Sequence, residues 1–155
     1  MNAYDIARVI RDAFENGDRP FRYTPETGTF AFACGGCWAV VLQPFGQNIE
    51  FSCWCRPALS IMSAVKLTEY AELLNAGVTD GKFSVRGHET AQGKLQLSCR
   101  FLKGCTDDFD GNVFAGMTED LENILSAAGK YLEAVADGTV SPEEAAASVF
   151  GGCGN

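Results

Sequence analysis

The stretch that most constrains the fold is residues 60–75, SIMSAVKLTEYAELLN, which Gly77 follows closely. Apolar side chains recur along it at spacings of three and four, while the charged side chains fall elsewhere on the helical wheel; the apolar set is Ala64, Leu67, Tyr70, Ala71, Leu74 and Val78. This spacing predicts an amphipathic helix. Because strand-like stretches precede and follow it, we expect the helix to lie on a sheet and both groups of strands to share one core.

The other elements are predicted from periodicity and turn residues. The expected elements are a helix at residues 3–16, strands at 29–34, 37–43 and 48–55, the helix at 60–75, strands at 82–86 and 94–101, and helices at 118–137 and 142–150. Residues 21–25 and 104–116 are expected to be irregular. The predicted fold is α+β, an antiparallel sheet packed against helices in the order α-β-β-β-α-β-β-α-α. We expect a single domain over residues 1–150 and a flexible tail at 151–155.

The turn between the first two strands of the predicted meander is Gly35-Gly36. Two glycines at the centre of a hairpin allow positive φ at both positions, so a two-residue turn is expected. In that register Cys34 and Cys37 are the closing pair of the hairpin, with Cα atoms about 5.5 Å apart.

Charge and hydropathy exclude several function classes. The chain has 155 residues, a formal net charge of −8 and a pI near 4.6. An acidic surface attracts neither nucleic-acid phosphates nor anionic lipid headgroups, so neither nucleic acid nor membrane is an expected partner. The first residues, MNAYDIARVIRDAF, carry charges throughout, and no stretch approaches the roughly 18–20 apolar residues that span a bilayer. A cytoplasmic location is expected.

Between about residue 65 and residue 145 several segments follow one another in a distinctive order: AELLN at 71–75, GKF at 81–83, KLQLSCR at 94–100, YL at 131–132 and VADGTVSPEEA at 135–145. In these segments the sequence resembles the YbjN-like family, candidate bacterial sensory transduction regulators whose fold is similar to that of type III secretion chaperones. The resemblance implies a non-catalytic regulator or chaperone-like binding module, often dimeric, and it supplies no catalytic residues.

The cysteines form the sharpest local motif, with Cys34-Gly35-Gly36-Cys37 followed by Cys53-Trp54-Cys55 among seven cysteines in all. Two alternatives use Cys34, Cys37, Cys53 and Cys55: a structural Zn²⁺ site, or thiol-redox chemistry by the CxxC pair. The spacing departs from paired zinc knuckles, and the CxxC pair closes a hairpin rather than opening a helix. We therefore expect free thiols that pack as small hydrophobes, with no cofactor.

Other candidate chemistry is weak. Residues 106–112, TDDFDGN, resemble a calcium loop, but Met117 stands where a bidentate glutamate is required. His88 is the only histidine and is expected on an exposed turn. No glycine-rich loop joins a strand to a helix in a phosphate-binding pattern. The chain is therefore predicted not to be an enzyme.

The predicted meander is rich in aromatic residues. These side chains either form a core under the helices or present an apolar face to another chain. The expected function is binding of another protein or a peptide segment, with a homodimer as one form of that interaction. The candidate binding residues are Trp54 and Phe45, followed by Trp38 and Phe51. We expect the first two to be accessible because they lie near a strand end and in a turn.

Overall fold

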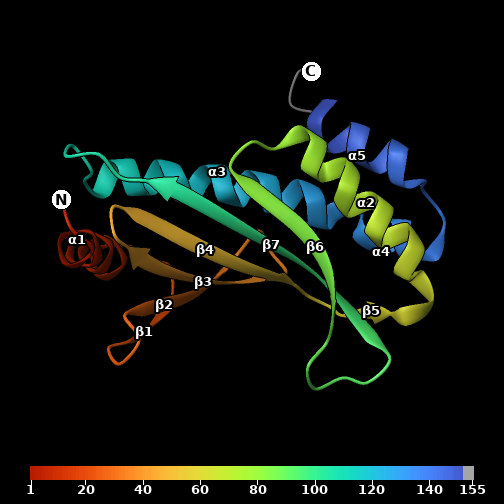
Figure 1. The fold of residues 1–155 in the computed structure, drawn as a ribbon, viewed down its shortest axis with the longest axis horizontal. Helices are drawn as coiled ribbons and strands as arrows, with labels where there is room; N and C mark the ends of the chain where they lie inside the picture. Colours follow the sequence, from red (N-terminus) through yellow and green to blue (C-terminus); the bar gives the residue numbers. More distant parts are fainter. Residues whose placement is uncertain (152–155) are drawn as a thin grey trace.

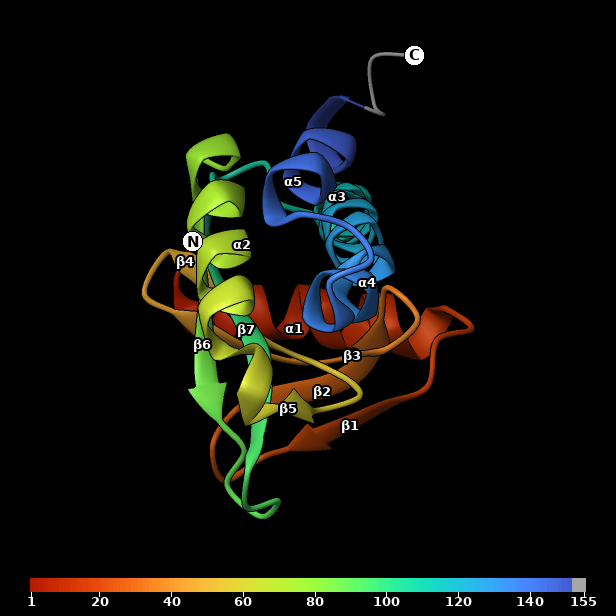
Figure 2. The same cartoon turned by 90° about the vertical axis from the view of Figure 1, so that its right-hand side faces the viewer.

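The computed structural model describes residues 1–151, and the chain folds into two layers, a twisted antiparallel sheet and a layer of helices. Figure 2 shows the helices on one side of the sheet, with α1 directly above β2 and β3 and the other helices further along the same face. The opposite side of the sheet, here called the outer face, carries no helix. The predicted α+β class is confirmed.

Seven strands form the sheet, in the order β1-β2-β3-β4-β7-β5, with β6 paired to the other edge of β7. Their bounds are Phe21–Thr24 (β1), Thr29–Cys34 (β2), Trp38–Phe45 (β3), Asn48–Cys55 (β4), Leu59–Ser60 (β5), Gly81–Gly87 (β6) and Lys94–Gly104 (β7). Strand β7 joins the two groups of strands, because it pairs with β4 on one side and β6 on the other. Two of the strands, β1 and β5, were not predicted.

The helices are α1 (Ala3–Asn16), a 3-10 turn η1 (Ile61–Ser63), α2 (Ala64–Gly77), α3 (Gly111–Lys130), α4 (Leu132–Asp137) and α5 (Pro142–Gly151). The expected loop at 104–116 is wrong in its second half, because Asp110 caps α3 by accepting a hydrogen bond from Val113 N at 2.9 Å. The expected helix at 118–137 is interrupted at Tyr131. Residue 151 ends α5, and the rest of the predicted tail lies outside the described residues.

Both groups of strands contribute to one hydrophobic core. The inward side chains of β4 alternate strictly with outward ones along Asn48–Cys55. From α2 the core receives Leu67, Tyr70, Ala71 and Leu74, four of the six residues of the predicted apolar face. Burial of these side chains against β6 and β7 confirms the shared core.

The helix α3 anchors both the sheet and α2 through its main-chain carbonyls. Trp38 Nε1 donates to Leu125 O at 2.8 Å, and the Tyr70 hydroxyl donates to Ala128 O at 2.7 Å. Both side chains are fully buried, so each polar end finds its partner inside the core. Among residues 1–151 no buried side-chain nitrogen or oxygen lacks a partner.

The hairpin between β2 and β3 has a different register from the predicted one. Cys34 pairs with Trp38, not with Cys37, so Gly35, Gly36 and Cys37 form a three-residue connection. Both glycines have positive φ, as expected, at 65° and 80°. The extra residue places Trp38 on the same face as Cys34 and Phe32, which is the core face.

The free edge of β6 is closed locally by the side chain of Asn75 from α2. Phe83 N donates to Asn75 Oδ1 at 2.6 Å, and Asn75 Nδ2 donates to Phe83 O at 2.9 Å. One side-chain amide thus occupies the two positions that a further strand would use at this residue. Native sheets commonly protect an edge in such ways against pairing with another chain.

Replacing Asn75 with alanine should lower the free energy of unfolding by about 1–3 kcal/mol, because two partly buried main-chain groups lose their partner. Urea titration of the purified variant measures the change. Asn123→Ala is the matched control, since Asn123 is an exposed asparagine on α3 and its replacement should alter stability by less than about 0.5 kcal/mol. Equal effects of the two substitutions would contradict the role assigned to Asn75.

Candidate binding surface

The outer face of the sheet is the side that the helices leave uncovered, and its composition is set by the alternation along each strand. Its central side chains are Ala39, Val41 and Gln43 on β3, Glu50, Ser52 and Trp54 on β4, Gln96, Ser98 and Arg100 on β7, and Lys82, Ser84 and Arg86 on β6. Most are small or polar. Trp54 is the one aromatic side chain among them, and it is half-buried.

Strand pairing places Trp54 among small neighbours. Ala39 lies directly opposite it on β3, and Ser98 lies directly opposite it on β7. Ser98 is itself held in place, because its hydroxyl lies 3.0 Å from that of Ser84 on the next strand. A large side chain between short ones leaves space beside it, so the surface around the indole is hollowed rather than flat.

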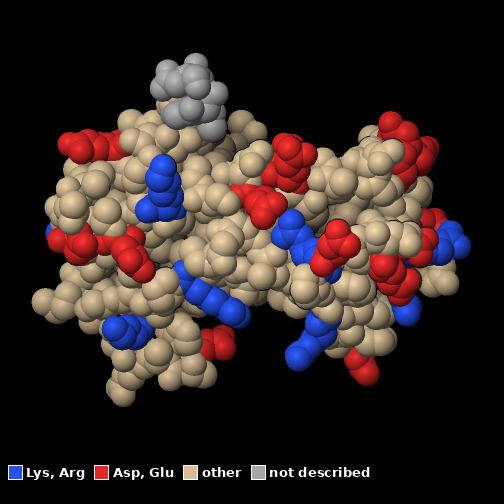
Figure 3. Space-filling model, turned by 180° about the vertical axis from the view of Figure 1, so that it is seen from behind, with Lys and Arg blue, Asp and Glu red and all other residues tan. Residues whose placement is uncertain are grey.

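Two hollows flank Trp54, and Arg86 lines both. The smaller, of about 210 Å³, lies over β4, β7 and β6 and is lined by Glu50, Ser52, Cys53, Trp54, Arg86, Ser98, Cys99 and Arg100. The larger, of about 510 Å³, extends toward the β6–β7 turn and is lined by Ala39, Trp54, Arg56, Arg86, Gly87, His88, Glu89, Thr90 and Gln96. We call the two together the Trp54 hollow. In Figure 3 the surface is hollowed between the β6–β7 turn and the β1–β2 end, with Lys and Arg side chains on both sides.

The lining of the Trp54 hollow carries three arginines and two glutamates, Glu50 and Glu89, and so has a slight positive charge although the chain as a whole carries a net charge of −8. Arg100 forms an ion pair with Glu50, which neutralises both. Arg56 and Arg86 have no ion pair with any residue in the described part of the chain. Two guanidinium groups are thus free to bind carboxylates or main-chain carbonyls beside an exposed indole edge.

The turn that borders the larger hollow is organised by His88. Its Nδ1 accepts hydrogen bonds from Thr90 N at 3.2 Å and Ala91 N at 3.0 Å. The main chain of His88 also donates to Lys94 O at 3.0 Å. His88 therefore shapes the wall of the hollow. It lies in the connection between β6 and β7, as predicted, but it is half-buried and not exposed.

Of the four aromatic residues predicted to bind a partner, only Trp54 lies in the hollow. Trp38 and Phe51, the other two candidate binding residues, are 1% and 0% exposed and so cannot contact a partner in this fold. The register that pairs Leu42 with Phe51 places both on the core face. Phe45 is 67% exposed but lies at the β3–β4 turn, about 20 Å along the strand from Trp54.

The structure does not bring the four cysteines of the metal hypothesis together around one point, although Cys37 and Cys55 are neighbours. Cys34, Cys53 and Cys55 lie buried on the core face, whereas Cys37 lies in the connection between β2 and β3. Within residues 1–151 no three Cys, His, Asp or Glu side chains are grouped to hold a metal ion. Burial raises the pKa of Cys53 to about 12 and raises those of Cys55 and Cys99 further.

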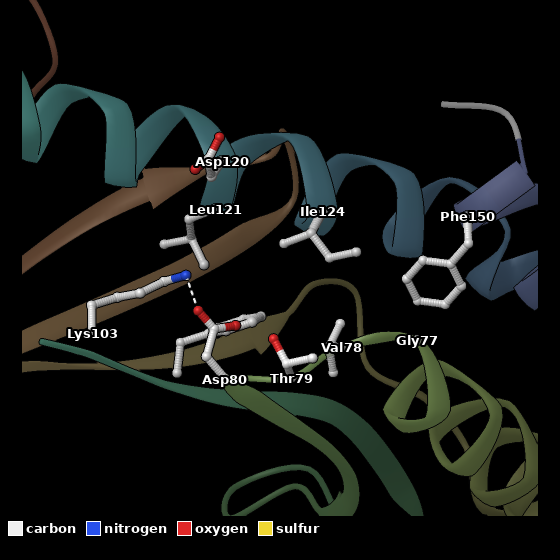
Figure 4. A pocket seen from close by; sticks show the side chains of 10 residues that line it. Gly77, Val78, Thr79, Asp80, Lys103, Asp120, Leu121, Ile124 and Phe150 are labelled. Carbon is white, nitrogen blue, oxygen red and sulfur yellow. Dashed lines mark hydrogen bonds and ion pairs between the residues drawn. The ribbon is translucent and has the colours of Figure 1, made fainter. Parts of the chain in front are cut away.

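A second cavity, of about 240 Å³, lies where α3 and α5 meet the end of α2 and the start of β6. Figure 4 shows Leu121, Ile124 and Phe150 pointing into it, while Lys103 and Asp80 form an ion pair at its side. The Phe150 ring packs on Gly77, where a Cβ would come within 2.4 Å of it. Apolar side chains make up much of the wall of this cavity, and Lys103 is already paired with Asp80. The cavity therefore offers fewer free polar groups than the Trp54 hollow.

A set of exposed apolar side chains lies at the start of α2. Ile61, Met62 and Val65 are 55%, 90% and 82% exposed. This patch was not predicted, because Ile61, Met62 and Val65 lie outside the set of apolar residues expected to face the sheet. None of the helices in the described part of the chain has the length and hydropathy needed to cross a bilayer.

Fold and surface together define an α+β protein whose sheet is covered by helices on one face and left open on the other. No protein family model and no curated protein matches the sequence. Among solved structures, the fold is similar to that of YbjN from E. coli, a candidate transcription regulator. The TM-score is 0.63 at 14% identity, over 84% of this chain and 92% of that one. The resemblance to the YbjN-like family expected from the sequence is thus confirmed in the fold.

Proposed function

We propose that this chain is a non-catalytic binding module that recognises another polypeptide in the Trp54 hollow. The observation that carries the proposal is the combination of a half-buried tryptophan, small neighbours and two unpaired arginines on the one face that no helix covers. Tryptophan and arginine are the residue types that most often dominate the binding energy of protein interfaces.

The partner segment is expected to be acidic and to contain an apolar side chain. Its carboxylates would neutralise Arg56 and Arg86, and its apolar side chain would pack on the Trp54 indole. The segment would lie across the face rather than extend the sheet at β6, because Asn75 already occupies the edge at Phe83.

A regulatory or chaperone-like role is the finer form of this proposal. It is supported by the fold shared with YbjN, whose description as a candidate transcription regulator applies to that protein. With a net charge of −8, this chain would regulate through a protein partner rather than through direct contact with DNA. A cytoplasmic location and a homodimer both remain predictions. Ile61, Met62 and Val65 form the apolar surface best suited to self-association.

Replacing Trp54 with alanine should reduce partner capture at least tenfold while lowering the free energy of unfolding by about 1 kcal/mol or less. Truncation of a hot-spot tryptophan costs about 2 kcal/mol or more of binding energy, whereas a half-exposed side chain contributes little to folding. Capture of partners from cells by immobilised protein, quantified by mass spectrometry, measures the first effect. Urea titration measures the second.

Tyr4→Ala is the matched control, because Tyr4 is an aromatic residue on α1 that is even more exposed and lies outside the hollow. It should retain the captured partner. A partner bound equally well by wild type, Trp54→Ala and Arg86→Glu would refute the assignment of the binding surface, provided that the variants remain folded.

A further inference from the structure

Two thiols that are 18 residues apart in the sequence, Cys37 of the CxxC motif and Cys55, lie in contact in the fold. Cys37 Sγ and Cys55 Sγ are 3.9 Å apart. Cys37 lies in the connection between β2 and β3, and Cys55 is the last residue of β4. The main chain holds them side by side, because Arg56 N donates to Cys37 O at 2.7 Å.

The two thiols differ in access to solvent. Cys37 is partly exposed, while Cys55 is 1% exposed. A small molecule can therefore reach Cys37 first, and Cys55 lies directly behind it. This is the arrangement of an attacking thiol and a resolving thiol in thiol–disulfide exchange.

Formation of a disulfide requires the connection around Cys37 to move toward Cys55. A disulfide requires the two sulfurs to approach to about 2.05 Å. Gly36, next to Cys37, has positive φ, and a Cβ placed there would meet no atom within 4 Å, so the turn has open space on that side. The remaining cysteines are less suited: Cys34, Cys53 and Cys99 are buried, and Cys105 follows β7.

We propose that Cys37 and Cys55 form an oxidisable dithiol pair that reacts with small disulfides of the glutathione class. The Cys37 thiolate attacks one sulfur of the small disulfide, whose S–S bond breaks and releases one thiolate. Cys55 then loses its proton to the thiolate released in the first step and, as the thiolate, attacks the Cys37 sulfur of the mixed disulfide, whose S–S bond breaks and releases the second small molecule as a thiolate that takes a proton from solvent. Overall, two protein thiols become one Cys37–Cys55 disulfide, and one small disulfide becomes two small thiols that carry the two protons.

The product ties the β2–β3 connection to the end of β4, one residue from Trp54. The fold also shows why the CxxC spacing alone suggests the wrong pair of cysteines. Cys34 and Cys37 flank the glycines in sequence, but Cys34 lies on the core face opposite Trp38 while Cys37 lies beside Cys55.

The test uses the full chain with Cys153→Ser, so that the cysteine outside the described residues does not react. The reduced protein is incubated with oxidised glutathione, and unreacted thiols are alkylated before intact-mass analysis and peptide mapping. We expect loss of two hydrogen atoms and a single cross-linked peptide pair containing Cys37 and Cys55. Cys55→Ser should instead accumulate a glutathione adduct on Cys37.

Cys37→Ser should abolish the intramolecular disulfide, and it changes only a partly exposed connection. Cys105→Ser is the matched control, because Cys105 is also partly exposed, and this variant should form the disulfide as the parent does. A disulfide that maps to Cys34 and Cys37, or a folded protein in which neither Cys37 nor Cys55 reacts, would overturn the proposal.

Discussion

Replacing Trp38 with alanine is expected to lower the free energy of unfolding by about 3–5 kcal/mol, the usual cost of removing a buried aromatic side chain. Trp38 is 1% exposed and lies between the sheet and α3. Its Nε1 donates to Leu125 O, so the substitution also removes a hydrogen bond inside the core. A domain of this size has only about 5–15 kcal/mol of stability, and the variant should be close to unfolding.

Urea titration followed by circular dichroism measures this loss, and Trp54→Ala is its natural comparison. The two tryptophans lie near the same end of the β3–β4 pair but on opposite faces of the sheet. The loss of stability should be several times larger at Trp38 than at Trp54. Similar losses at the two positions would show that the outer face is also buried and would exclude it as a free surface.

The stability of the folded chain should fall steeply above pH 9. Burial raises the pKa of Cys53 to about 12 and those of Cys55 and Cys99 further, whereas the same thiols in the unfolded chain ionise near pH 8.5. Their stabilising contribution is therefore complete below the unfolded pKa and is lost as the pH rises. Each thiol that ionises only in the unfolded chain removes about 1.4 kcal/mol per pH unit. Three such thiols give a loss of about 3–4 kcal/mol between pH 9 and pH 10.

Urea titrations with reductant at pH 7.5, 9 and 10 measure this slope. Cys53→Ala should lower stability at neutral pH by leaving a small cavity, but it should reduce the slope above pH 9 by about a third. A free energy of unfolding that stays constant from pH 9 to pH 10 would mean that these thiols are accessible to solvent in the folded chain.

Much of the fold follows from periodicity in the sequence. The apolar spacing along α2 and the alternation along β4 predicted which side chains share a face, and both were confirmed. The turn at Gly35 and Gly36 was predicted correctly as a turn but with one residue too few. Because successive side chains in a strand point to opposite faces, that single residue decides whether Trp38 lies opposite Ala33 or opposite Cys34.

The binding surface was harder to predict than the fold. The run from Trp38 to Leu42 is apolar on both faces, so alternation could not show which face the helices cover. Trp54 was predicted to be accessible because it lies near the end of a strand. The physical reason for its exposure is different: its side chain lies on the face of the sheet that no helix covers. Arg86 was missed altogether. It shares a face with Lys82 and Ser84 by simple alternation, but it meets Trp54 only through the pairing of β6 with β7 and of β7 with β4.

Photo-crosslinking from the outer face in living cells tests the central claim most directly. A photoreactive amino acid replaces Ser52, which lines the Trp54 hollow, or Thr68, which lies exposed on α2. Irradiation should join a polypeptide other than a second copy of this chain from position 52 and not from position 68, and Arg86→Glu should abolish the product. Crosslinks from position 68 alone, with none from position 52, would show that the helical side binds the partner and would contradict this account.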